Sequence, residues 1–272
     1  FNGSVEDDLT NFYDYISHFK IKIKKPKNTS GNIHVLKNKK DVIYFEAGDP
    51  PKKNYSSCYQ SGPLSFEYFF DEQKIITNSG FGINISNKAR LLSRLTSSQS
   101  ALCLNDTSIV GFEKSNMMNK AYGYLIRREF KILNLEHKND QNQIEVKAGH
   151  DAYLKNFSCL HNRSISIDKI NNKVVGQDRL IKKNINSKIK YDIRFHLYPG
   201  LTAVQTIGGN NLLIQINKNK ALLFSTNERN LKIEKSIFFG GQKVLENHCI
   251  VISGIMENKE KTIDWEINKN IK

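Results

Sequence analysis

The sequence predicts an all-β protein, built as one large antiparallel β-sandwich, and three observations support this. From about residue 30 onward, apolar and polar residues alternate with a period of two in short runs, the pattern of half-buried strands. Segments rich in Asn, Gly and Lys separate these runs, as the turns of antiparallel hairpins do. Only one segment, near the start, has the 3.6-residue period of a helix. A closed barrel is the weaker alternative, because a chain with many strands divides more readily into two packed sheets.

The helical segment covers residues 4–19. Ser4 can cap its N-terminus, and acidic residues occupy the first turn, where they interact favourably with the helix dipole. Leu9, Phe12, Tyr13 and Ile16 fall at i, i+3, i+4 and i+7, which places them on one face. We therefore predict one helix with its linker over residues 1–28 and a sandwich domain over residues 29–272.

The strands expected after this helix are short and closely spaced. They cover residues 32–38, 41–48, 64–70, 74–79, 101–106, 124–137, 143–149, 164–170, 191–199, 201–207, 211–217, 221–226, 231–239 and 249–255. The segment 64–79 is expected to be a hairpin that turns at residues 71–73. The longest surface loop is expected at residues 46–57, because Pro50 and Pro51 cannot continue a central strand.

The composition is strongly basic. With 41 Lys and Arg against 27 Asp and Glu, the chain carries a net charge of +14, which favours a polyanionic partner such as nucleic acid, anionic lipid or an acidic polysaccharide. The charge alone does not choose among these, and its scattered lysines are also typical of an ordinary solvated surface. Basic residues are not interleaved with aromatic residues as in single-strand binders, so we expect no nucleic-acid partner.

Several classes of protein are disfavoured by what the sequence lacks. No apolar run approaches the roughly 18 residues that a membrane-spanning helix needs, so we expect no membrane span. Cys58, Cys103, Cys159 and Cys249 form no C-x-x-C pair, which argues against a zinc ribbon or a redox dithiol. The sequence starts at Phe1 without a signal-peptide pattern, so we expect it to be cut from a longer chain.

A cluster of chemically active residues follows the strand expected at 143–149. Tyr153 is the best candidate for a catalytic acid or base, and His150 is a second candidate beside it. His150 and Asp151 would face opposite sides of a strand but could both ligate one metal in a loop. With His161 further on, the candidate metal ligands are His161 and Asp151. The alternative is that these side chains only pack and hydrogen-bond, as is common in sandwiches.

The strand expected at 191–199 carries a second pattern. Its apolar residues at 193, 195 and 197 share one face, and Arg194, His196 and Tyr198 share the other. Such a face can bind a carboxylate and transfer a proton, which makes His196 a catalytic candidate and Arg194 and Tyr198 substrate-binding candidates. It would equally suit the wet side of a half-exposed sheet.

A series of collinear short motifs resembles the C-terminal half of bacterial heparinase II/III-like proteins. These are "YFEAGDPPKKNYSSCYQSGPLSFEYFF", "KIITNSGFG", "LTSSQSALCLNDTS", "AGHDAYLKNFSCLHNRSI", "VVGQDRL", "YDIRFHLYPG" and a last "IVISGI…IDWEI". The resemblance runs over roughly residues 40–268 and implies a supersandwich preceded by an α/α toroid. The helix at 4–19 would then be left over from that toroid domain, which is otherwise absent from this chain.

The resemblance also implies an activity. Relatives are polysaccharide lyases that cleave uronate-containing glycans such as glycosaminoglycans by β-elimination, in a cleft between toroid and sandwich. The implied partner is an acidic polysaccharide, and the implied location is the bacterial cell envelope or periplasm, where such glycans are digested. A structural divalent metal, Zn or Ca, held by His and Asp in the sandwich is implied as well. No other cofactor is expected.

Two positions depart from the family pattern. Where relatives tend to have His, this chain has Gln60 before "LSFE" and Gln99 before "SALCLND". A glutamine can donate a hydrogen bond to a substrate carboxylate but cannot act as a base at neutral pH, so both are substrate-binding candidates. These replacements leave open a second function, a sandwich that binds or scaffolds anionic polysaccharide without cleaving it.

Overall fold

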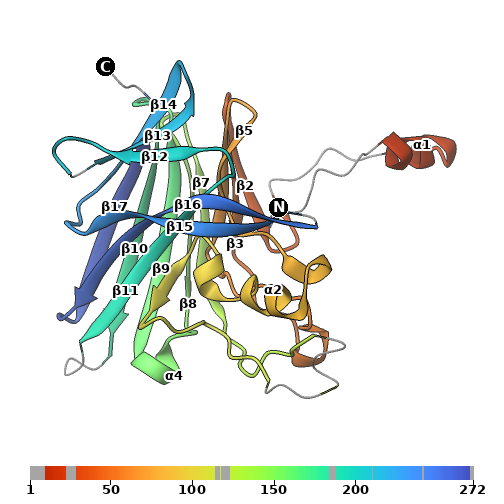
Figure 1. Cartoon of the computed structure of the whole chain (residues 1–272), viewed down its shortest axis with the longest axis horizontal. Coiled ribbons are helices and arrows are strands. Elements are labelled where there is room, and N and C mark those ends of the chain that lie inside the picture. The colour runs from red at the N-terminus through yellow and green to blue at the C-terminus, as the bar shows by residue number, and fades with distance from the viewer. Residues whose placement is uncertain are drawn as a thin grey trace.

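The computed structural model describes residues 10–22, 29–113, 117, 123–183, 188–209, 211–240 and 242–269. These residues form two antiparallel sheets that pack face to face as a sandwich (Figure 1), which confirms the predicted fold class. Helices and loops around α2 and α4 lie at the lower end of the sandwich in the view of Figure 1, and the hairpin of β13 and β14 lies at the upper end.

The first sheet has the strand order β1–β2–β3–β4–β5–β11–β16–β15, with β6 paired to β11. Its strands are β1 (Thr29–Ser30), β2 (Ile33–Asn38), β3 (Asp41–Glu46), β4 (Phe66–Phe70), β5 (Gln73–Thr77), β6 (Leu102–Leu104), β11 (Ile189–Leu197), β15 (Leu231–Gly240) and β16 (Lys243–Met256). β11 is the central strand, because Ile193 pairs with Leu102 of β6 and with Ile252 of β16.

The second sheet has the order β12–β13–β14–β17–β10–β9–β8–β7. Its strands are β7 (Ile132–Asn139), β8 (Gln143–His150), β9 (Cys159–Asp168), β10 (Lys173–Lys182), β12 (Thr202–Gln205), β13 (Asn211–Asn217), β14 (Lys220–Thr226) and β17 (Glu260–Asn268). β8, β9 and β10 are long strands whose buried polar side chains include His150, His161, Arg163 and Asp178.

Short helices complete the described chain. They are α1 (Thr10–His18), η1 (Lys53–Tyr55), η2 (Gly82–Asn84), α2 (Asn87–Leu92), η3 (Thr96–Ser98) and α4 (Leu154–Phe157). α1 confirms the predicted helix over its second half, whereas its predicted cap Ser4 and the apolar Leu9 lie outside the described residues. The predicted domain boundary at 28/29 also adjoins such residues. None of the described helices is long and apolar enough to cross a membrane.

Trp265 forms the centre of the core. Its indole stacks against Phe66 of the first sheet at a centroid distance of 5.4 Å, and Phe195 of the same sheet meets it edge-on at 4.9 Å. Gly176 lies opposite Trp265 on β10, and a Cβ there would come within 2.0 Å of the indole. The glycine therefore makes room for the largest side chain in the core.

Most predicted strands are present, with two kinds of difference. The predicted hairpin at 64–79 is confirmed as β4 and β5, with Asp71 and Glu72 at positive φ in a tight turn. The predicted strand 124–137 is wrong over its first half, because β7 begins only at Ile132. The preceding stretch is a connection that buries Ile126 and Phe130. Strands β10 and β17 were not expected from the alternation.

Candidate functional site

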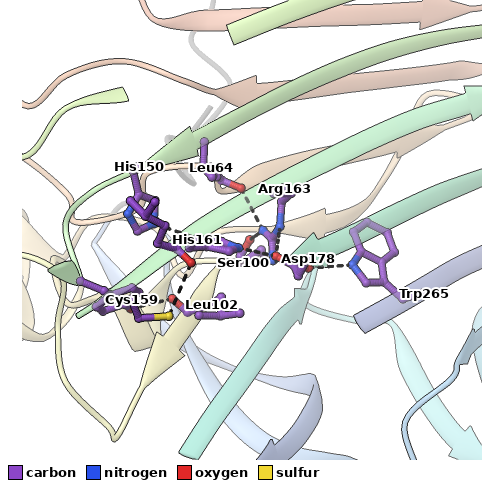
Figure 2. A network of polar contacts seen from close by, with 11 residues as sticks. Leu64, Ser100, Leu102, His150, Cys159, His161, Arg163, Asp178 and Trp265 are labelled. Carbon is purple, nitrogen blue, oxygen red and sulfur yellow. Dashed lines mark hydrogen bonds and ion pairs between the residues drawn. The ribbon is translucent and has the colours of Figure 1, made fainter. Parts of the chain in front are cut away.

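Two of the candidate histidines meet in the interior of the sandwich (Figure 2). His150 ends β8 and His161 lies directly opposite it on β9, with Nε2 of His150 3.1 Å from Nδ1 of His161. The Ala152 backbone N–H donates to Nδ1 of His150, and Nε2 of His161 lies 2.6 Å from Asp178 on β10. Because Nδ1 of His150 accepts, its Nε2 carries the proton and donates to Nδ1 of His161, and Nε2 of His161 in turn donates to Asp178, with both rings neutral.

Asp178 is the acceptor on which this network converges (Figure 2). Its carboxylate accepts hydrogen bonds from Nε and Nη2 of Arg163 at 2.8 and 3.1 Å and from the indole N–H of Trp265 at 3.0 Å. Burial opposes ionisation, but the charge of Arg163 and the bond from His161 outweigh it and hold the pKa of Asp178 below its ordinary value. Nη1 of Arg163 also donates to the carbonyls of Leu64 and Ser100, which ties the second sheet to the first.

Tyr153 lies beside this network but faces inward. Its side chain is 1% exposed, its hydroxyl donates to the Leu102 carbonyl at 2.8 Å, and its ring packs 5.4 Å from that of His150. Burial raises the pKa of Tyr153 well above its ordinary value. The structure thus brings together Tyr153, His150 and His161, as the clustering in sequence suggested, in a position that a polysaccharide does not reach in the closed sandwich.

His196 lies in the other sheet and is buried as well. Its Nε2 donates to the Ser97 carbonyl at 3.0 Å, so Nδ1 is the acceptor for the hydroxyls of Ser79 and Ser236 at 3.3 and 3.1 Å. His196 itself is covered by the segment around Ser97–Ser100 and by Ser236 of β15, so this part of the face is not open to solvent. Arg194 itself is only partly buried and reaches toward Asp192.

Tyr198 follows β11 and is partly exposed. Its ring packs edge-on against Phe238 at 5.7 Å, and the Lys74 ammonium lies 5.7 Å from the ring centroid. Among the three polar residues predicted to share one face, Tyr198 and Arg194 therefore keep some exposure and His196 has almost none. Their roles in binding stay predictions.

The burial of His196 makes stability depend on pH. Burial lowers its pKa to about 4 from 6.5, so its contribution is fully present above pH 6.5 and is lost as the pH falls toward 4. From this shift we expect a loss of about 3 kcal/mol. His196→Gln should remove that part of the acid dependence, measured as urea unfolding at pH 7, 5.5 and 4.5. His18→Gln, on exposed α1, is the matched control. An unchanged acid slope in His196→Gln would contradict the assignment.

The donor set does not fit the structural metal that the family resemblance implies. Both nitrogens of His161 are engaged, with His150 and Asp178. Asp151 instead accepts the Lys131 backbone N–H at 2.7 Å, and no contact joins it to His161. Among the described residues, no group of three or more His, Cys, Asp or Glu side chains is arranged to hold a metal ion. The predicted ligands are therefore not brought together.

The loop at residues 56–61 contains buried polar atoms that, unlike those of the histidine network, have no hydrogen-bond partner. Gln60 is 9% exposed, and its Oε1 has no hydrogen-bond partner, nor does the buried hydroxyl of Tyr59. Gln99 is buried nearby against Gly62, and its amide donates to the Ser93 carbonyl at 2.8 Å. Buried polar atoms without partners are rare in folded proteins and often indicate a site completed by a ligand or water.

Glu46, at the end of β3, lies next to this loop. Its carboxyl group accepts one hydrogen bond, from Ser65 Oγ at 3.3 Å, and no cation among the described residues offsets the effect of its burial. Burial raises the pKa of Glu46 to about 8, so the group is largely protonated at neutral pH. Burial, and after it the charges of Glu46 and Asp49, raise the pKa of Tyr59 well above its ordinary value.

Sequence reasoning missed Asp178 and Glu46. Asp178 lies within "VVGQDRL", a motif of the family resemblance, so that motif was the available signal. Glu46 had no comparable signal, because a glutamate at the end of a strand is ordinarily exposed.

Comparisons with known proteins agree with this architecture. A family model described as Heparinase II/III-like, C-terminal, matches residues 25–266. A search of curated proteins finds no match. The crystal structure of heparan sulfate lyase HepC from Pedobacter heparinus superimposes on 97% of this chain with a TM-score of 0.73 and 14% identity. A heparinase III gene product superimposes on 96% with a TM-score of 0.71 and 13% identity.

A further crystal structure of heparinase III covers 96% of this chain with a TM-score of 0.66 and 15% identity. At such identities the likeness shows the fold. The chain covers 42%, 41% and 42% of these three structures' own lengths.

Proposed function

Because this chain belongs to the heparinase II/III-like C-terminal domain family, we propose that it is the sandwich domain of a polysaccharide lyase that cleaves uronate-containing glycans by β-elimination. The observation that carries the proposal is the match of almost the whole sandwich to heparan sulfate lyase and heparinase III structures. An N-terminal toroid domain would supply the other wall of the cleft. The bacterial envelope or periplasm is the location that fits such a substrate.

The reaction sets what the site must supply. A base removes the proton from C5 of the uronate, the electrons form the C4–C5 double bond, and the C4–O bond breaks as the departing oxygen is protonated. Hydrogen-bond donors or cations must also neutralise the neighbouring carboxylate, since the C5 proton is otherwise weakly acidic. The net charge of +14 assists the capture of such a polyanion.

The candidates divide by exposure. Tyr153, His150 and His196 are 3% exposed or less and are bonded inward, which supports structural roles in holding the two sheets. Gln60 lies in the 56–61 loop and has an unpartnered oxygen, which supports a role in binding. We place the sandwich's contribution to the site at this loop.

The test is an assay of the longest natural chain that contains these residues, on heparin, heparan sulfate, alginate and other uronate glycans. Ultraviolet absorbance of the unsaturated uronyl product is expected to rise. Tyr153→Phe should retain turnover in proportion to its folded fraction. A complete loss in folded Tyr153→Phe protein would instead place its hydroxyl in the chemistry.

A glycan-holding module without chemistry is the second candidate function. The inward bonding of all three predicted catalytic side chains favours it, as do the glutamines at positions 60 and 99. Retained binding of uronate glycans with no unsaturated product on any of them would establish this alternative and remove the lyase proposal.

A further inference from the structure

A buried arginine holds the 56–61 loop in place through hydrogen bonds to its backbone. Arg94, just after α2, is fully buried, and its Nε and Nη2 donate to the carbonyls of Tyr59 and Ser56 at 2.7 and 2.6 Å. Its own carbonyl accepts the Ser61 backbone N–H at 2.9 Å, and its guanidinium lies over the ring of Phe112. Arg94 therefore contacts the beginning, middle and end of the loop.

The charge of Arg94 has no counterion within the described chain. The side-chain polar contacts of Arg94 among the described residues are to backbone carbonyls, and its Nη1 is buried without a hydrogen-bond partner. Burial and the nearby Arg90 lower the pKa of Arg94 to about 10, so it stays charged at neutral pH. A buried cation that is satisfied only by carbonyls is unfavourable unless an anion binds close by.

Arg90 places a second guanidinium on the solvent-exposed side of the same loop. Its Nη2 lies 3.4 Å from the Ser57 carbonyl and 3.7 Å from the Cys58 sulfur. Gly123 borders it, and a Cβ there would come within 2.4 Å of Arg90. Cys58 is exposed, so this side of the loop faces solvent.

The acidic groups around the loop do not cancel this positive charge. Asp49 is paired with Lys131 at 2.7 Å and Glu113 with Lys53 at 2.6 Å. Glu46 is held mainly in its neutral form at pH 7 by burial, which raises its pKa to about 8. The electrostatic potential on the solvent-exposed side of the loop, around Cys58, is therefore positive.

We propose that the 56–61 loop binds the anionic group of a uronate glycan. Arg90 would contact the anion directly, and the buried Arg94 would contribute its positive charge at longer range. A carboxylate or a sulfate is suited to this place, because both accept hydrogen bonds from a guanidinium in the same geometry. The inference rests on the proposed function, since it gives that substrate's anionic group a position, but binding here does not require turnover.

Cys58 provides the measurement, because the other three cysteines are buried and only this thiol is exposed. The experiment compares its rates of modification by the dianionic reagent 5,5′-dithiobis(2-nitrobenzoate) and by neutral iodoacetamide. The ratio of the two rates cancels the thiolate fraction and reports the local field. At low ionic strength, Arg90→Gln should lower this ratio by about three- to tenfold, and added salt should reduce the difference.

Matched variants control for folding and for net charge. Arg90→Lys keeps the charge and should keep most of the ratio. Arg179→Gln removes one charge from the outer face of β10, where Arg179 pairs with Glu260, and should leave the ratio unchanged. An equal fall in Arg179→Gln and Arg90→Gln, or no fall in either, would overturn the proposed field.

Ligand protection completes the test. An unsulfated uronate oligosaccharide and a sulfated one should each slow modification of Cys58 in the wild type and protect Arg90→Gln several-fold less, while a neutral oligosaccharide of equal length should not protect. Protection by the sulfated probe alone assigns the site to sulfate. Protection by neither anionic probe overturns the proposal, and it does so whether or not the longer protein shows lyase activity.

Discussion

Replacing Asp178 with asparagine is expected to lower the free energy of unfolding by about 3 to 5 kcal/mol. The substitution leaves Arg163 charged, fully buried and without its counterion. It also turns an amide N–H₂ toward the donors of Arg163 or Trp265, which now bind carboxylate oxygens. The measurement is urea unfolding followed by fluorescence, for which Trp265, the single tryptophan, is a direct probe of the core.

A surface pair on the same strand is the control for this prediction. Arg179 and Glu260 form a bidentate pair at 2.5 and 2.9 Å that is about half exposed. Glu260→Gln should therefore change stability by roughly 0 to 1 kcal/mol. If Asp178→Asn and Glu260→Gln lose equal stability, the buried network is not what joins the sheets.

The fold was largely predictable because the alternation of apolar residues is a direct consequence of two packed sheets. β10 shows where that signal fails. Its inward positions include Gly176 and Asp178, so the hydrophobic alternation is broken by a residue that makes room for Trp265 and by the acceptor of the buried network. The stretch 124–131 shows the opposite failure, because buried Ile126 and Phe130 mimic a strand in a connection.

The site was less predictable, since residue type does not reveal whether a side chain faces solvent or a second layer. The pattern of Arg194, His196 and Tyr198 suggested a polar face, but β15 and the segment around Ser97 cover that face and bury His196. Clustering in sequence was more informative for His150 and His161, because neighbouring antiparallel strands bring them together. Arg94, which hydrogen-bonds to the 56–61 loop, is the opposite case, because its position in sequence does not indicate these contacts.

Glu46→Gln is expected to stabilise the protein at alkaline pH and to have little effect at pH 5. Burial raises the pKa of this carboxyl to about 8 from 4.5, so its contribution is fully present below pH 4.5 and is lost as the pH rises through 8. The shift corresponds to a loss on the order of 5 kcal/mol. Glutamine stays neutral and can still accept the hydrogen bond from Ser65, so it should not undergo this loss.

The difference in unfolding free energy between Glu46→Gln and wild type should therefore grow from near zero at pH 5 to its largest value above pH 8. Glu113→Gln is the matched control, because Glu113 is partly exposed and its lysine partner lowers its pKa, which gives the opposite sign of pH dependence. A difference that stays flat from pH 5 to 8.5 would mean that Glu46 is ionised at neutral pH. Its carboxylate would then offset the positive field of the 56–61 loop already at pH 7, and anion binding there would be weak throughout, without the fall toward alkaline pH that a pKa of about 8 predicts.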